Sequence, residues 1–141
     1  MGAAFHAPLR PVPFDGVAGA PVPGHSVSIR RPPPIVVVIP TCDRPDLLRN
    51  RALRSVAGQD APPDLVLVVD DSSRASRPIV REVVREFSRQ SRCEVWYLRN
   101  SHARGLAGTL NSALDRLAVH RPDAVVATLD DDDEWDPGYL R

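Results

Sequence analysis

The sequence predicts an α/β fold in which a mainly parallel sheet of about four strands is flanked by helices. Four short apolar runs recur about every thirty residues, which is the length of one strand-helix unit. Between them, apolar residues recur at helical spacing. The apolar runs cover residues 35–39, 65–69, 93–98 and 124–129.

A segment of different composition precedes the first apolar run. Residues 1–34 contain more than half of the 15 prolines and half of the 8 glycines. A segment so rich in proline and glycine cannot bury enough apolar surface to offset the entropy lost on ordering it. We therefore expect a disordered leader over residues 1–34, with a docking peptide as the alternative, and a folded domain over residues 35–141.

The first strand, residues 35–39, is a continuous aliphatic run, which is typical of a strand buried on both faces. The helix after it follows from Leu48, Ala52 and Val56, which lie four residues apart and share one face. Pro45 suits its first turn, where a missing N–H costs little.

The later strands are each followed by a helix or by a polar turn. Strand 65–69 leads to a helix whose apolar face comprises Ile79, Val80, Val83, Val84 and Phe87. Strand 93–98 leads to a helix whose apolar face comprises Leu106, Leu110, Ala113, Leu114 and Leu117. We expect both faces to pack against the sheet. Strand 124–129 leads directly into an acidic run.

Polar residues follow every predicted strand at its carboxyl end, where open parallel sheets bind ligands. The four polar segments cover residues 41–44, 70–73, 100–105 and 130–134. Because parallel strands end on the same side of a sheet, one rim is expected to collect all four.

The acidic run, residues 130–134, reads Asp-Asp-Asp-Asp-Glu. Two unit charges about 4 Å apart repel by roughly 1 kcal/mol even in water, so such crowding favours a bound cation. Hard carboxylate oxygens suit Mg²⁺ or Mn²⁺. In an extended backbone Asp130 and Asp132 point to one face and Asp131 to the other, which makes Asp130 and Asp132 a D-x-D pair. A solvated acidic turn is the alternative.

The other rim residues each have two interpretations. Asp43, Asp70 and Asp71 can accept hydrogen bonds from a nucleobase N–H or a ribose hydroxyl, or can cap helices and turns. Arg104 can reach a phosphate or a sugar acid, and Gly105 can allow close backbone approach. A surface arginine and a turn glycine are the alternative for that pair.

Several classes of site and partner lack support. There is no G-x-G-x-x-G after the first strand and no phosphate-binding P-loop, and the acidic run lacks the spacing of an EF-hand. Cys42 and Cys93 do not form a C-x-x-C pair, so zinc and redox motifs are unsupported and reduced thiols are expected. The formal net charge is zero, so no nucleic-acid partner is expected. Without a signal pattern or an apolar span, we expect a cytoplasmic location or peripheral attachment at the inner face of the membrane.

Together these motifs resemble the family 2 glycosyltransferases, which have the Rossmann-like GT-A fold. The matching segments are residues 36–44 and 68–73, Asn100 with Arg104-Gly105 and Asn111, and residues 129–135. The resemblance covers about residues 35–141. It implies a nucleotide-sugar donor (a UDP-, dTDP- or GDP-sugar), Mg²⁺ or Mn²⁺ as cofactor, and hexosyl transfer with inversion of the anomeric centre.

The resemblance also implies roles for individual residues. Those near the nucleobase and ribose would be Thr41, Asp43, Asp70 and Asp71. Arg104 and Gly105 would lie near the pyrophosphate or base. Asp130 would contact ribose or sugar, and Asp132, with Asp130, would bind the metal, which neutralises charge on the departing nucleoside diphosphate.

Such enzymes also need a carboxylate general base and an acceptor-binding half, which in the family follow the D-x-D. This chain ends at Arg141, so we expect a donor-binding portion truncated before the catalytic base, with the catalytic residues unassigned. A non-catalytic nucleotide-sugar-binding or interaction module, as a remnant or one half of a split protein, is the alternative. A third possibility is an unrelated doubly wound domain whose acidic turn binds phosphate through Mg²⁺. Uncovered apolar surface would favour self-association or a partner that completes the domain.

Overall fold

The computed structural model describes residues 31–141, so the predicted leader falls almost entirely outside the described residues. Within residues 31–141, four strands form a single sheet. These are β1 (Ile35–Thr41), β2 (Leu65–Asp70), β3 (Glu94–Arg99) and β4 (Val125–Thr128). Their spatial order is β3-β2-β1-β4, and all neighbours are parallel. The strands run from the middle of the sheet outward, first to one edge and then to the other.

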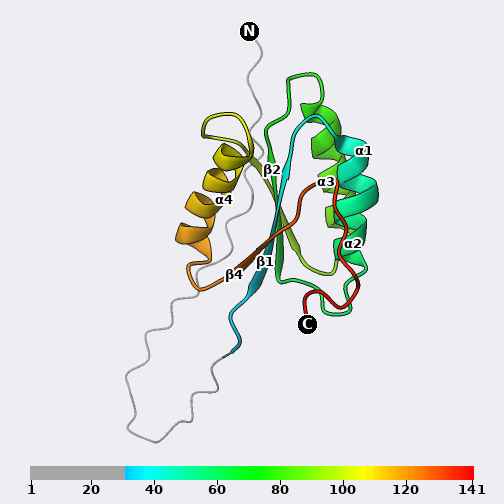
Figure 1. Ribbon diagram of the computed structural model, residues 1–141, viewed down its shortest axis with the longest axis vertical. Coiled ribbons are helices and arrows are strands. Elements are labelled where there is room, and N and C mark those ends of the chain that lie inside the picture. The colour runs from blue at the N-terminus through cyan, green and yellow to red at the C-terminus, as the bar shows by residue number, and fades with distance from the viewer. Residues whose placement is uncertain (1–30) are drawn as a thin grey trace, which may run out of the picture. The chain divides into compact units, whose positions relative to one another are not determined.

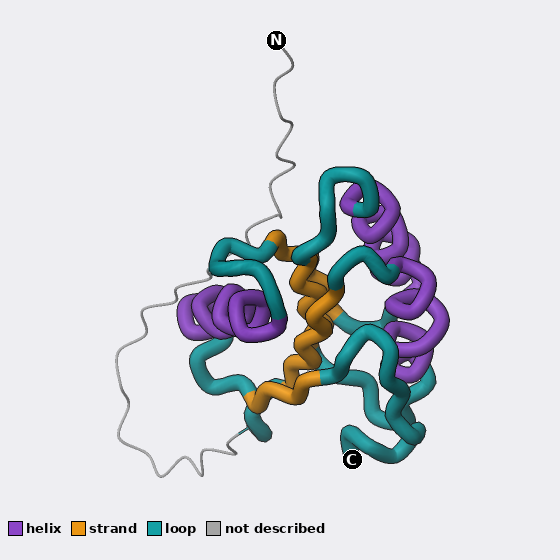
Figure 2. The backbone as a smooth tube through the Cα atoms, turned by 45° about the horizontal axis from the view of Figure 1, so that its top comes forward, coloured by secondary structure: helices purple, strands orange, loops and turns teal. Residues whose placement is uncertain are grey.

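Helices cover both faces of this sheet, as Figures 1 and 2 show. The helix α4 (Leu106–His120) lies on one face. The other face packs against α3 (Arg77–Gln90) and a segment that continues from α1 (Pro45–Leu47) through the π-helix η1 (Leu48–Leu53) to α2 (Arg54–Ala57). This arrangement confirms the predicted α/β fold with a parallel sheet flanked by helices.

The core follows from the alternation of side chains along the two central strands. Successive residues of a strand point to opposite faces, so a strand covered on both sides is apolar throughout. One layer of the core comprises Val36, Val38, Leu65, Leu67 and Val69 with Ala113 and Leu117 of α4. The opposite layer comprises Val37, Ile39, Val66 and Val68 with buried residues of η1, α2 and α3. The side chains on both faces of β1 and β2 are therefore buried.

Two helices bury most of their predicted apolar faces but leave three of the predicted residues exposed. Val80, Val83 and Val84 of α3 and Ala113 and Leu117 of α4 are buried. Ile79 is 55% exposed, Leu106 is 55% exposed and Leu114 is 52% exposed, so none of the three lies on a buried face. On α4 the small residues Gly108 and Ser112 are buried instead. They lie against the loop that precedes the helix, which turns the apolar side chains of Leu106 and Leu114 toward solvent.

The outer strand β4 pairs only with β1 among the described residues. Its Val125 is 52% exposed, and an uncovered strand edge can pair with another chain. The self-association predicted from the sequence stays a prediction, and the uncovered edge of β4 is a surface through which it could occur. Within residues 31–141 no helix has both the length and the apolar character needed to cross a membrane.

Candidate functional site

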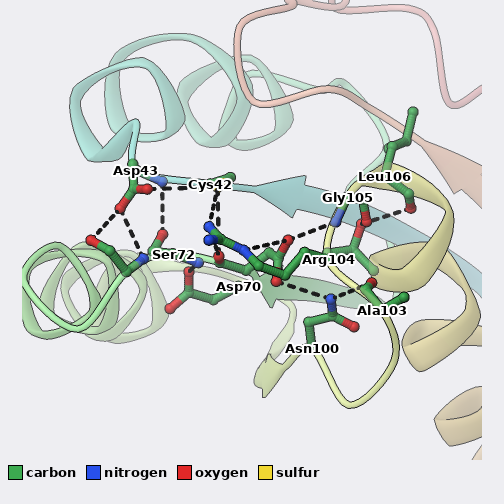
Figure 3. Close-up of polar contacts among 12 residues, drawn as sticks. Cys42, Asp43, Asp70, Ser72, Asn100, Ala103, Arg104, Gly105 and Leu106 are labelled. Atoms are coloured by element: carbon green, nitrogen blue, oxygen red, sulfur yellow. Dashed lines mark hydrogen bonds and ion pairs between the residues drawn. The ribbon is translucent and has the colours of Figure 1, made fainter.

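The carboxyl ends of the strands form one rim, and hydrogen bonds connect the segments that follow them (Figure 3). The segment after β1 joins that after β2, because the Asp43 N–H donates to Ser72 Oγ at 2.8 Å. The segment after β2 joins the start of α4, because the Gly105 N–H donates to Asp71 Oδ2 at 2.8 Å. The segment after β1 also joins the acidic turn, because Thr41 Oγ1 donates to Asp131 Oδ2. All four predicted segments are therefore connected.

Asp43 has a backbone conformation that few residues other than glycine adopt. Its φ is 54°, in the left-handed region where Asp and Asn are enriched. Its Oδ1 accepts hydrogen bonds from Ser73 Oγ at 2.8 Å and from the Ser73 N–H at 2.9 Å. The Ser73 side chain first, then the Ser76 side chain and the Ser73 N–H, lower the pKa of Asp43 to about 2 by hydrogen bonding. The carboxylate is thus ionised at neutral pH on an exposed side chain, with the Cys42 thiol 3.8 Å from Oδ2.

Asp70 lies beneath the rim rather than on it. Its side chain is 0% exposed. Oδ1 accepts from the Ser72 N–H at 2.8 Å, and Oδ2 accepts from the Tyr97 hydroxyl at 2.5 Å and from Arg99 Nη1 at 3.4 Å. Burial, and then the Asp70 carboxylate, raises the pKa of Tyr97. Asp70 therefore fixes the segment after β2 from below.

Asp71 connects that segment to the loop before α4. Its Oδ1 accepts from Asn100 Nδ2 at 3.0 Å and its Oδ2 from the Gly105 N–H at 2.8 Å. Gly105 has a φ of 110°, and a Cβ added there would meet nothing within 4 Å. Conformation rather than lack of space thus requires glycine at this position. Asp71 is 7% exposed, and both of its carboxylate oxygens are bonded within the chain.

Arg104 supplies an exposed positive charge on the same rim. Its side chain is 73% exposed. Nη2 donates to the Asp71 carbonyl at 3.4 Å and lies 3.9 Å from Cys42 Sγ, while Nε lies 3.9 Å from Asp71 Oδ2. An exposed guanidinium of this kind suits a phosphate or pyrophosphate group. Cys42 is a free thiol whose pKa is raised, chiefly by burial.

The acidic run separates into buried and accessible carboxylates. Asp131 is 0% exposed, Asp132 is about half-exposed and Asp130 is exposed. Thr41 Oγ1 donates to Asp131 Oδ2 at 2.7 Å. Arg44 Nη2 lies 2.6 Å from Asp131 Oδ1, in an ion pair whose angles do not meet hydrogen-bond geometry, and Arg44 Nη1 donates to Asp132 Oδ2 at 2.9 Å. Burial raises the pKa of Asp131, against the opposing effects of Thr41 and Arg44.

Asp130 and Asp132 offer accessible hard oxygen ligands, but residues 130–133 form a turn, closed by a 3.1 Å hydrogen bond from the Asp133 N–H to the Asp130 carbonyl, and not the extended backbone that predicted a shared face. Within residues 31–141 no three His, Cys, Asp or Glu side chains lie close enough together to hold an ion by themselves. Mg²⁺, which Mn²⁺ resembles in its ligands, commonly binds through one or two carboxylates, waters and the phosphates of a substrate. These two carboxylates thus suit a cation that a nucleotide helps to bind.

Two residues important for this geometry received no role from the sequence. Arg44 pairs with the acidic turn, and its position directly after Asp43 at a strand end was the available signal. Gln59 is 2% exposed. Its Nε2 donates to the carbonyls of Ser55 and Asp136 at 3.2 and 2.8 Å, and its Oε1 accepts from the Leu140 N–H at 3.1 Å. Gln59 thereby holds the segment after the acidic turn, and nothing in its local sequence indicated this.

Solved structures similar to this chain are glycosyltransferases. One is the mannosyltransferase PcManGT from Pyrobaculum calidifontis, in complex with GDP-Man and Mn²⁺, with 26% identity, a TM-score of 0.57, and coverage of 75% of this chain and 29% of the other. TarS from S. aureus matches with 27% identity, a TM-score of 0.51, and coverage of 76% and 18%, respectively. The chain thus spans less than a third of the length of either protein. A search of curated protein sequences found no match.

The structural likeness confirms the predicted GT-A fold. Residues 36–141 also match the sequence family described as glycosyl transferase family 2. That match starts within β1 and ends at the last residue of the chain, so it includes all four segments of the rim. The chain belongs to glycosyl transferase family 2.

Proposed function

We propose that the rim binds a nucleotide-sugar donor together with Mg²⁺ or Mn²⁺, and that the chain supplies the donor side of an inverting sugar transfer. The observation that carries this proposal is the hydrogen-bonded rim, which places unlike groups on one surface. Asp43 contributes an exposed, ionised carboxylate, Arg104 an exposed cation, and Asp130 and Asp132 accessible carboxylates. A nucleoside diphosphate sugar needs this combination of groups.

The exposed residues make the direct contacts in this proposal. Asp43 accepts a hydrogen bond from a nucleobase N–H or a ribose hydroxyl, since its carboxylate is exposed and ionised at neutral pH. Arg104 faces the diphosphate, for which its planar guanidinium is suited. Asp130 contacts ribose or sugar, and Asp132 holds the cation.

The buried residues act by positioning. Asp70 and Asp71 fix the segment after β2 and the Gly105 amide, and their oxygens are already engaged within the chain. Thr41 fixes Asp131 and with it the acidic turn. Such a pre-formed surface lowers the entropy lost when a ligand binds.

A bound divalent cation supplies stabilisation of the charge that develops on the departing nucleoside diphosphate. In the transfer, a bond forms between the acceptor oxygen and the anomeric carbon while the bond from that carbon to the diphosphate oxygen breaks. The acceptor proton passes to a base that we assign to no residue of this chain. Arg104, facing the diphosphate, also stabilises the leaving group.

A GDP-sugar is one candidate donor, because the similar mannosyltransferase was solved with GDP-Man and Mn²⁺. UDP- and dTDP-sugars fit the same rim, since none of its described contacts selects one base. The test is calorimetry of the full chain with GDP, UDP and dTDP, each with and without Mn²⁺. We expect at least one nucleotide to bind in a Mn²⁺-dependent manner, and absence of such binding by the folded protein would refute the proposal.

The assignment of Asp132 is tested in the same assay. Asp132→Ala is expected to abolish the Mn²⁺ dependence of nucleotide binding while leaving the circular dichroism spectrum unchanged. Asp133→Ala is the matched control, because this neighbouring side chain is exposed and forms no hydrogen bond or ion pair within residues 31–141. Unchanged Mn²⁺ dependence in Asp132→Ala would show that the cation binds elsewhere.

A further inference from the structure

Arg44 lies between the buried and the accessible carboxylates of the acidic turn. Its Nη2 is 2.6 Å from Asp131 Oδ1 and its Nη1 is 2.9 Å from Asp132 Oδ2. A single guanidinium thus bridges two consecutive aspartates. Arg51 adds a second positive group, because its Nη1 donates to the Asp132 carbonyl at 2.9 Å.

The two carboxylates differ in how strongly they need Arg44. Asp131 is 0% exposed, and no other cation of the described residues pairs with it. A buried carboxylate without a counter-charge is costly, so this ion pair is retained. The Asp132 side chain is 43% exposed, so it can exchange Arg44 for another cation at little cost.

We propose that Arg44 is an internal counter-cation that competes with the divalent metal for Asp132. Asp131 is its permanent partner and Asp132 its exchangeable one. A metal at Asp132 displaces Nη1 from Oδ2, while Nη2 stays on Asp131 and keeps the turn folded. The inference rests on the proposed metal role of Asp132, and it adds that Arg44 sets the metal affinity.

This competition has a direct physical basis. The guanidinium occupies Oδ2, one of the two Asp132 oxygens that a metal would use, and also repels a divalent cation placed beside it. Removing the charge eliminates both effects. A variant without the Arg44 charge loses one exposed ion pair and one cation–cation repulsion. It should therefore bind Mn²⁺ about 3- to 10-fold more tightly than the wild type.

The test is a titration of the full chain with MnCl₂, in the presence and absence of GDP, with free Mn²⁺ followed by electron paramagnetic resonance. Arg44→Gln is expected to lower the Mn²⁺ Kd about 3- to 10-fold and to lower the Tm, since Asp131 loses its partner. Arg44→Lys keeps a charge for Asp131 but cannot bridge both carboxylates. It should lower the Kd with a Tm closer to that of the wild type.

Arg49→Gln is the matched control, because Arg49 pairs with Glu86 at 2.8 Å and both side chains are 46% exposed. It should leave the Mn²⁺ Kd unchanged. An unchanged or raised Kd in both Arg44 variants would overturn the inference, even if Mn²⁺-dependent nucleotide binding is observed. If no variant binds Mn²⁺ in either condition, the metal role of Asp132 and this inference both fail. Mn²⁺ binding that tightens in Arg44→Gln without any nucleotide binding would support the inference and refute the proposed donor site.

Discussion

Gly108 offers the sharpest test of how α4 holds the rim. It lies in the first turn of α4, is buried, and faces the backbone of the loop that carries Arg104 and Gly105. A Cβ added at Gly108 would lie 1.7 Å from the Ala103 carbonyl oxygen and 2.9 Å from its carbon. That oxygen also accepts a hydrogen bond from Asn100 Nδ2 at 3.0 Å. Gly108→Ala must therefore push the loop and the helix apart.

The size of the effect follows from two opposing contributions. An ordinary contact of about 3.4 Å requires a backbone displacement of about 1.7 Å. Overpacking of this kind lowers the free energy of unfolding by about 1–3 kcal/mol. A clash with backbone atoms is expected to lie at the upper end of that range. Replacing a helical glycine by alanine returns about 1 kcal/mol of helix propensity. We expect the free energy of unfolding to fall by about 2 kcal/mol.

The measurement is urea denaturation of Gly108→Ala and of a matched glycine variant. Gly58→Ala is the control, because a Cβ there would meet only ordinary contacts at 3.6 Å and the φ of −84° is accessible to alanine. It should be neutral or stabilising by up to about 1 kcal/mol. If Gly108→Ala is as stable as the wild type within about 0.5 kcal/mol, the close approach of α4 to the loop is wrong.

Three further changes test other regions of the rim. Ser73→Ala should raise the pKa of Asp43 from about 2 toward its usual value, followed by NMR titration of the carboxyl carbon. The lowered pKa stabilises the wild-type fold above about pH 4, and this contribution is lost as the pH falls toward 2. The variant should therefore lose less stability than the wild type between these pH values. An unchanged pKa of Asp43 would contradict the role of the Ser73 hydroxyl. Thr41→Val should cost about 1–3 kcal/mol in urea denaturation by leaving Asp131 without its donor, whereas Thr41→Ser should not, and equal stabilities would refute that role. Gln59→Leu should accelerate amide hydrogen exchange in the segment after the acidic turn, and unchanged protection would show that other contacts hold it.

The strands and their order along the chain were predictable because their signals are local. An uninterrupted aliphatic run such as residues 35–39 indicates a strand buried on both faces, and β1 confirms it with the core residues Val36–Ile39. Apolar spacing located α3 and α4 and most of their buried residues, Val83 and Leu117 among them, but it also included three residues that are exposed. Ile79, Leu106 and Leu114 are exposed because helix packing depends on the partner surface, and α4 approaches its preceding loop through Gly108 and Ser112.

The sequence by itself determined the fold class, the family and the set of polar segments that meet at the carboxyl ends of the strands. Only the tertiary structure decided which aspartates of that set are accessible. Asp131 is buried and accepts a hydrogen bond from Thr41, 90 positions away, and Asp132 is paired with Arg44, 88 positions away. Periodicity reports the alternation of neighbours along one segment, whereas the burial and charge balance of a carboxylate depend on groups that distant segments bring to it.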